Sequence, residues 1–167
     1  MMKYWKLGFL YILVSFFPFI GLGATNNEQV PSCSFTSIGN SDQVTLNQLE
    51  GEVIYLDFWA SWCIPCLKSF PFLNELHHEY SEQGLHILAV NVDEHLEDAQ
   101  QFLNQMPVDF KVMIDPQQQC AKAFALKGMP SSFIIDRSGT IYHTHLGFMS
   151  SDIKEIKDSV KQALLKQ

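Results

Sequence analysis

The stretch EVIYLDFWASWCIPC, residues 52–66, joins a run of β-branched and aromatic residues to two cysteines, Cys63 and Cys66. Its first nine residues have the length and composition of a buried strand. Apolar residues then recur at helical spacing, which predicts a helix from Cys63 to Tyr80. A second strand-like run, LHILAVNVD, follows at 85–93. The segment therefore reads as strand, helix and strand, which implies two parallel strands joined by a right-handed connection.

The rest of the chain continues this alternation. The expected elements are a helix at 94–106, a strand at 109–115, a short helix at 118–126, a hairpin with strands at 131–136 and 140–147, and a last helix that begins near Ser151 or Asp152. Gly139 supplies the positive φ that the hairpin turn requires. Glu155 is placed to complete a capping box with Asp152 at the start of the last helix. Together these elements predict an α/β domain with a central sheet and helices on both faces.

The two cysteines fall where the first strand ends and its helix begins. Three interpretations compete for such a pair: a redox-active disulfide, half of a metal site or a static crosslink. A zinc site needs four ligands, and the sequence contains no second CxxC and no His-x-x-x-His pair. Free N–H groups and the helix dipole favour the thiolate of Cys63, which makes it the expected nucleophile. Pro65 is tolerated in the first helical turn, and Cys66 should be more buried.

Length and composition describe the setting of this pair. A chain of 167 residues with 47% apolar residues is sufficient for one well-buried domain. The basic start MMKYWK precedes the uncharged run LGFLYILVSFFPFIGLG, which predicts a cleaved signal peptide over 1–24, with a retained membrane anchor as the alternative. The domain would then be 25–167, exported or periplasmic. Because thiols outside the cytoplasm are not kept reduced, a reduced pair there requires a supply of electrons.

The charge balance excludes some partners. The chain has 11 basic and 18 acidic residues, a net charge of −7. Removal of Lys3 and Lys6 with the signal gives 9 minus 18, or −9. This acidic balance, with Arg137 as the single arginine, argues against nucleic acid or anionic lipid as a partner.

Several separate stretches resemble the thioredoxin superfamily, and within it the exported thiol-disulfide oxidoreductases of the TlpA and ResA type. DFWASWCIPC matches the strand-to-helix motif, and Pro71 falls where thioredoxins kink the helix that follows. KGMPSSFIID matches the loop that carries a cis-proline, DRSGTIYHTHLG the hairpin after it, and VPSCSFTSIGNSDQVTLNQLEGE an N-terminal β extension. The resemblance implies a thioredoxin fold, with a central mixed sheet flanked by helices.

The resemblance also implies roles for particular residues. Cys63 would attack a disulfide, Cys66 would resolve the mixed disulfide, and Asp57 would be a buried acid able to accept the Cys66 proton. Pro130 would be cis, and the backbone of Met129 would pair with an extended substrate. The expected residues of the substrate surface are Trp62, Ile64, Pro65, Met129 and Pro130, with Trp59 and Trp62 packed around the pair. No cofactor and no metal are expected.

Two departures limit the transfer from the family. A glutamate that often follows the second cysteine by three residues in this branch is Ser69 here, and the buried lysine of thioredoxins is replaced by an apolar residue near Ala89. The redox potential of the family's members is therefore not transferred to this chain.

The sequence favours an exported protein-disulfide reductase, because proline directly before the second cysteine resembles the reducing thioredoxins. The expected partners are disulfide-containing exported proteins and a membrane electron donor that re-reduces the pair. Apocytochrome c, a copper-site assembly protein and a general disulfide pool all stay open as substrates. A copper-delivery module on the same fold is the alternative function, and a structural disulfide-bonded adaptor is a third.

The sequence contains two further pairs of potentially reactive side chains, one of histidines and one of cysteines. His143 and His145 alternate on one strand and so face the same side, which is copper-binding geometry in principle, although histidines on a hairpin are commonly solvated. Cys33 and Cys120 could form a bridge, stay buried as thiols or link to a partner. The sequence slightly favours buried or unpaired thiols for this second pair.

Overall fold

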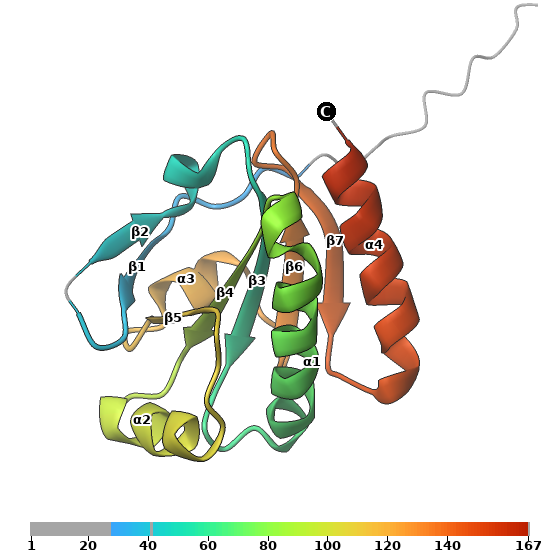
Figure 1. The fold of residues 1–167 in the computed structure, drawn as a ribbon. Helices are drawn as coiled ribbons and strands as arrows, with labels where there is room; N and C mark the ends of the chain where they lie inside the picture. The colour runs from blue at the N-terminus through green and yellow to red at the C-terminus, as the bar shows by residue number, and fades with distance from the viewer. Residues whose placement is uncertain (1–27, 41, 167) are drawn as a thin grey trace, which may run out of the picture.

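A computed structural model describes residues 28–40 and 42–166 (Figure 1). The expected signal peptide or anchor at 1–24 lies outside these residues. Within the described ranges, no helix is both long enough and apolar enough to cross a membrane.

The strands form one mixed sheet of seven in the order β2-β1-β5-β4-β3-β6-β7. Their bounds are β1 (Ser34–Ser37), β2 (Gln43–Thr45), β3 (Val53–Trp59), β4 (Leu85–Asn91), β5 (Lys111–Ile114), β6 (Ser131–Ile135) and β7 (Ile141–Leu146). The pairs β3–β4 and β4–β5 are parallel, and the other neighbours are antiparallel. The expected thioredoxin-like sheet and the N-terminal β extension, formed by β1 and β2, are confirmed.

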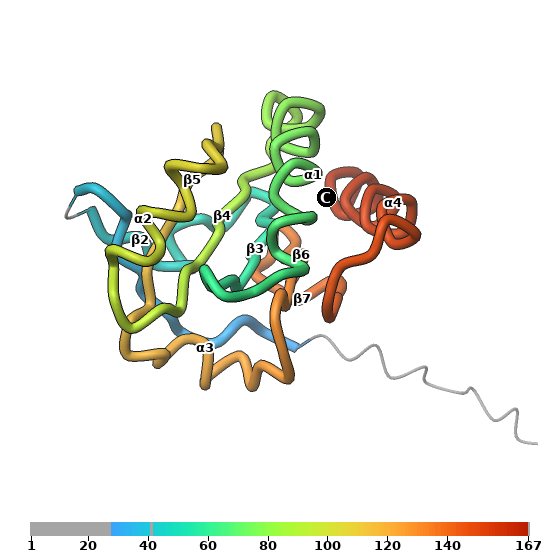
Figure 2. Tube along the Cα trace, turned by 90° about the horizontal axis from the view of Figure 1, so that it is seen from below, coloured from blue at the N-terminus to red at the C-terminus, as the bar shows by residue number. Residues whose placement is uncertain are grey.

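Helices cover both faces of the sheet. They are α1 (Ile64–Tyr80), α2 (Leu96–Gln105), α3 (Gln119–Ala123) and α4 (Ile153–Leu165). Figure 2 shows α1 and α4 on one face and α3 on the opposite face. The apolar positions of α1 that predicted the helix, Phe70, Leu73 and Leu76, are fully buried against the sheet.

Successive side chains of β3 point to opposite faces and supply the centre of both halves of the core. On one face, Trp59 packs against Phe70 of α1 and Phe102 of α2, with ring centroids 4.8 and 4.7 Å away. On the other face, Phe58 packs against Phe124, which follows α3, at 5.3 Å. The strand that precedes the cysteines is thus fixed from both sides.

The expected capping box at the last helix is wrong. A 3₁₀ turn, Ser150–Asp152, precedes α4, and Asp152 makes no side-chain cap to that helix. Its Oδ2 instead accepts a hydrogen bond from the Met149 N–H at 2.7 Å. The acid that the sequence pattern assigned to the start of α4 therefore caps the turn before it, and Glu155 remains free to face β7.

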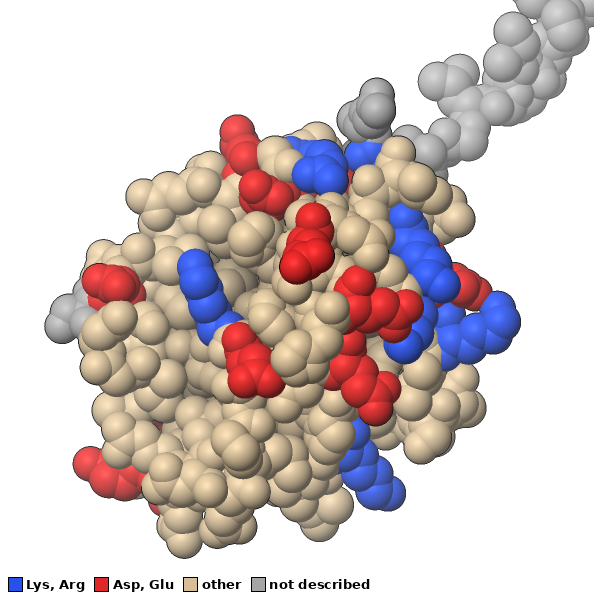
Figure 3. Space-filling model, viewed as in Figure 1, with Lys and Arg blue, Asp and Glu red and all other residues tan. Residues whose placement is uncertain are grey.

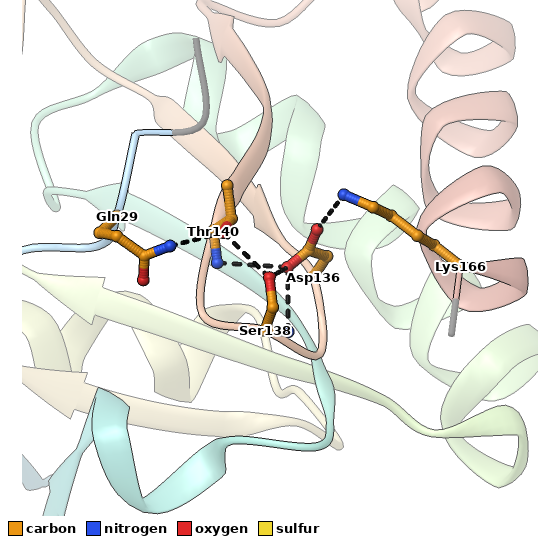
Figure 4. A network of polar contacts seen from close by, with 5 residues as sticks. All are labelled: Gln29, Asp136, Ser138, Thr140 and Lys166. Atoms are coloured by element: carbon orange, nitrogen blue, oxygen red, sulfur yellow. Dashed lines mark hydrogen bonds and ion pairs between the residues drawn. The ribbon is translucent and has the colours of Figure 1, made fainter. Parts of the chain in front are cut away.

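A polar network joins three distant parts of the chain (Figure 4). Asp136, directly after β6, accepts hydrogen bonds from Ser138, Thr140 and the Lys166 ammonium. Gln29 donates to the Thr140 hydroxyl at 2.8 Å. Burial opposes ionisation of Asp136, but the Lys166 ammonium and the other donors outweigh it and lower the pKa of the carboxyl. The network fastens the N-terminal segment and the end of α4 to the β6–β7 turn.

Candidate active site

The fold places Cys63 at the N-terminus of α1. Strand β3 ends at Trp59, a short turn follows, and Cys63 is the N-cap residue of this 17-residue helix. The Cys63 sulfur accepts a hydrogen bond from the Cys66 N–H at 3.2 Å. Pro65 lies within the first turn, where its missing N–H leaves no helical hydrogen bond unmade. A negative charge on this sulfur would meet free N–H groups and the positive end of the helix dipole.

Cys63 and Cys66 form a disulfide, with Cα atoms 5.3 Å apart. Cys66 is fully buried and Cys63 is 3% exposed, in the order expected from the sequence. The side chains on either side of Cys63 are far more exposed than Cys63 itself, since Trp62 is 68% and Ile64 72% exposed. The disulfide therefore lies just below a surface made by its own neighbours.

The peptide bond Met129–Pro130 is cis, as expected. The loop lies next to the end of β3, because Ser131 pairs with Phe58 across β6 and β3. The Pro130 carbonyl accepts a hydrogen bond from the Gly147 N–H at 2.8 Å, which fixes one side of the loop. Among the described residues, the backbone groups of Met129 have no hydrogen-bond partner. Met129 thus offers an N–H and a carbonyl beside the cysteine motif.

Asp57 is a buried carboxyl in β3, on the same face as Trp59. The Ser132 hydroxyl donates a hydrogen bond to Oδ1 at 2.6 Å, and Oδ2 has no partner in the described part of the chain. Burial raises the pKa of Asp57 to about 7, although the Ser132 hydrogen bond lowers it. Ala89 is the residue opposite Asp57 in β4, so the apolar replacement expected from the sequence lies next to this carboxyl. No cation at that position offsets its charge.

Ser69 stands where the resemblance to the TlpA and ResA type led us to expect a glutamate. It is buried in α1, and its hydroxyl donates to the Cys66 carbonyl at 3.2 Å. The side chain therefore satisfies its own polar group locally and brings no second carboxyl to the site.

Exposed apolar side chains lie at the start of α1 and in the loop after β7. The two tryptophans of the motif separate, since Trp59 is fully buried in the core and Trp62 is largely exposed. Leu67 of α1 and Met149, which follows β7, are also exposed, by 45% and 65%. In Figure 3, the lower end of the molecule, where α1 begins, carries few charged residues. The motif is thus set in an apolar and weakly charged surface.

His143 and His145 are less solvated than their hairpin position suggested. Their side chains are 24% and 15% exposed, because both face α4. His145 Nε2 lies 3.1 Å from Asp152 Oδ2, and His143 Nε2 lies 3.7 Å from Glu155 Oε1. One potential ligand atom each from His143, His145 and Glu155 lies within 4.8 Å of the others. The sequence pattern paired the histidines but gave no sign of the carboxylates that α4 and the turn before it bring to them.

The sheet order and the disulfide at the start of α1 define the class of protein as a thioredoxin-fold oxidoreductase. Comparison with known proteins narrows the class. The Redoxin family model matches residues 25–163, so the chain belongs to the Redoxin family. Thiol-disulfide oxidoreductase ResA of Geobacillus thermodenitrificans is 36% identical over 117 residues, which cover 70% of this chain and 67% of the relative. The ResA of Bacillus anthracis is 35% identical over 120 residues, 72% of this chain and 69% of the relative.

Solved structures agree with this assignment. A putative thiol:disulfide interchange protein DsbE from Chlorobium tepidum superposes with a TM-score of 0.79 and is 38% identical, with 83% of this chain and 96% of that chain covered. A putative protein disulfide isomerase from Bacteroides thetaiotaomicron has a TM-score of 0.76 at 24% identity over 84% of this chain and 90% of its own, which shows the fold alone. The protein is a thiol-disulfide oxidoreductase with a cysteine pair at Cys63 and Cys66.

Proposed function

We propose that the protein is an exported protein-disulfide reductase in which Cys63 is the nucleophile. The observation that carries the proposal is the position of Cys63 as N-cap of α1, with its sulfur directed at the Cys66 N–H. Both the N–H groups and the helix dipole stabilise a thiolate there, so Cys63 is the more acidic thiol of the reduced pair.

The reaction transfers two electrons from the dithiol to a substrate disulfide. The Cys63 thiolate attacks one substrate sulfur, the substrate S–S bond breaks, and the other substrate sulfur leaves as a thiolate. Cys66 then loses its proton and attacks the Cys63 sulfur. The mixed disulfide breaks, the second substrate thiolate leaves, and the enzyme is left with the Cys63–Cys66 disulfide.

Asp57 is proposed as the acceptor of the Cys66 proton. It is buried on the face of β3 covered by α1, and its pKa of about 7 lets it hold or release a proton near neutral pH. The Oδ2 atom, which has no partner among residues 28–40 and 42–166, is the site where a proton can bind. Ser132 holds the other oxygen in place.

Substrate would dock on the surface around the cysteines. The backbone groups of Met129, beside cis-Pro130, have no partner in the described part of the chain and can pair with an extended segment, as an added strand does. Trp62, Ile64 and Pro65 supply apolar contact next to Cys63. Because backbone groups make these contacts, docking of this kind depends on the substrate segment being extended more than on its sequence.

The direction of electron transfer and the partners are inferred from the sequence. Pro65 directly before Cys66 supports reduction, which requires a membrane electron donor to restore the dithiol. Disulfide-containing exported proteins are the substrate class, with cytochrome c biogenesis as one setting in which such a reductase acts. Residues 1–24 would direct export, as a cleaved signal or a retained anchor.

Two cysteine variants test the proposal. Cys63→Ser should abolish reduction of insulin disulfides, because no nucleophile remains. Cys66→Ser should capture substrates as mixed disulfides that persist until an external thiol is added, visible as a mass increase on a non-reducing gel. Full turnover by Cys66→Ser would show that the roles are assigned wrongly.

The cluster of His143, His145 and Glu155 favours a second candidate, a metal-delivery module that carries copper. Two imidazoles and a carboxylate suit Cu²⁺ or Zn²⁺, and the ligand atoms are already within 4.8 Å of one another. Glu155 is largely exposed and can turn toward the histidines.

Calorimetric titration of the disulfide form with Cu²⁺ tests this candidate, because the closed disulfide removes the thiols as ligands. His143→Ala should weaken binding at least about tenfold, which corresponds to about 1.4 kcal/mol. His86→Ala is the matched control, since His86 lies 3.5 Å from Glu52 without a second histidine. Equal binding by all three proteins would remove the candidate.

A further inference from the structure

Two cysteines outside the redox pair lie together in the core. Cys33 directly precedes β1 and Cys120 lies in α3, and their exposed fractions are 6% and 5%. The Cys120 thiol donates a hydrogen bond to the Ser34 carbonyl, with sulfur and oxygen 3.8 Å apart, so it reaches the residue next to Cys33. The two thiols also lie close enough for each to shift the pKa of the other. Both are free thiols in the structure, as the sequence slightly favoured.

The surroundings of these thiols differ from those of Cys63. Burial raises the pKa of both Cys33 and Cys120, and the nearby Asp115 carboxylate raises it further. Asp115 is fixed in place by two backbone N–H groups of α3, at 3.0 and 2.9 Å. A thiol with a raised pKa is a poor leaving group, so a disulfide between these two sulfurs would resist exchange. The pair is thus suited to a lasting bond and not to a catalytic cycle.

Cys33 and Cys120 lie where a bond between them would join two separate parts of the fold. The N-terminal extension joins the main sheet where β1 pairs with β5 through two residue pairs, Thr36 with Ile114 and Ser37 with Met113. In Figures 1 and 2, α3 lies beside this extension. The chain runs on from α3 directly to the cis-Pro130 loop. A bond from Cys33 to Cys120 would therefore tie the extension to the segment that leads to the active site.

We propose that Cys33 and Cys120 form a second, structural disulfide when the protein folds in an oxidising compartment. Two S–H bonds break and one S–S bond forms, and two protons and two electrons leave the pair. The electrons pass to a disulfide of an oxidised protein or small-molecule thiol partner, by exchange through a mixed disulfide. Because both sulfurs are buried in the finished fold, the exchange takes place before β1 packs on α3. Afterwards the bond remains closed while Cys63–Cys66 opens and closes.

The test counts thiols in the full chain with the redox pair removed as Cys63→Ser/Cys66→Ser. The reduced, denatured protein is refolded in a mixture of reduced and oxidised glutathione, unfolded again without reductant and alkylated. We expect no alkylated cysteine, a mass two hydrogen atoms below that of the reduced protein, and one linked peptide containing Cys33 and Cys120. Two alkylated cysteines would overturn the proposal. If this variant does not refold, peptide mapping of the exported, otherwise unmodified protein gives the same decision.

A second variant separates the bond from packing. Cys33→Ala/Cys120→Ala retains Cys63 and Cys66 and should keep the rate of disulfide exchange. Its Tm should lie on the order of 5–15 °C below that of the oxidised protein, because a crosslink across a long loop restricts the unfolded chain. The Cys63→Ser/Cys66→Ser protein, compared in its oxidised and reduced forms, is the control for loss of side-chain volume, because it has no other disulfide to open. An oxidised protein no more stable than the reduced one would refute the stabilising role. The thiol count does not depend on reductase activity, so failure of the proposed function would leave this result unaffected.

Discussion

Replacement of Asp57 with asparagine should change how stability depends on pH. The pKa of Asp57 is about 7 in the fold, against an ordinary value of 3.8. The folded protein therefore holds a proton that the unfolded chain releases between these pH values, and stability falls as pH rises from about 4 to about 7. At about 1.4 kcal/mol per unit, the full loss is about 4 kcal/mol above pH 7. Asp57→Asn has no charge to desolvate and should lack this loss.

The net gain in stability of Asp57→Asn over the unmodified protein will be smaller than the pH-dependent change. The new amide places N–H groups where Oδ2 now has no partner among the described residues, at a cost of about 1–3 kcal/mol. Urea unfolding of the disulfide form from pH 4.5 to 8.5 measures both quantities. The free energy of unfolding of Asp57→Asn should come to exceed that of the unmodified protein as pH rises. The difference between the two proteins should stop growing above about pH 7. Asp98→Asn, at an exposed site in α2, is the control that should follow the unmodified curve. Parallel curves for Asp57→Asn and the unmodified protein would refute the reasoning.

Three further outcomes are expected. Ser132→Ala should raise the pKa of Asp57 further, because its hydrogen bond opposes the effect of burial; the pH midpoint of the unfolding curves reports the change. Pro130→Ala should raise KM for a protein substrate about tenfold by disturbing the docking loop, with unchanged alkylation of the reduced nucleophile as the check on specificity. Lys166→Ala should cost about 1 kcal/mol at pH 7, since the lysine is half exposed; the loss should shrink as pH falls and the Asp136 carboxylate, whose pKa Lys166 lowers, becomes protonated.

The central strands, the active-site helix and the hairpin could be predicted because they are long and strongly patterned. Strand β3 and the helix after Cys63 appear where residues 52–80 indicated. The cis-proline could be predicted only through the resemblance, since the local sequence around Pro130 does not itself specify a cis bond.

Features that depend on packing between distant segments could not be predicted. The sequence does not show that α4 and the turn before it bring Glu155 and Asp152 to the histidines of β7. The capping box at Asp152 failed because this extra turn precedes the helix. The contact between Cys33 and Cys120 likewise depends on where β1 meets α3. Trp62 and Trp59 are alike in the sequence, and only the end of β3 decides that one is buried and the other exposed.

Strand β3 pairs with β4 along all seven of its residues and with β6 along five, and every residue in it is buried. Amides in such a strand exchange with solvent only when the whole domain unfolds, whereas those in the peripheral β1 and β2 exchange through smaller local openings. Asp57 belongs to this slowest-exchanging part, and the turn to Cys63 begins where the strand ends. A partner that pulls on the extension, or a fluctuation that releases it, would therefore leave the spacing between the carboxyl and the cysteine pair unchanged.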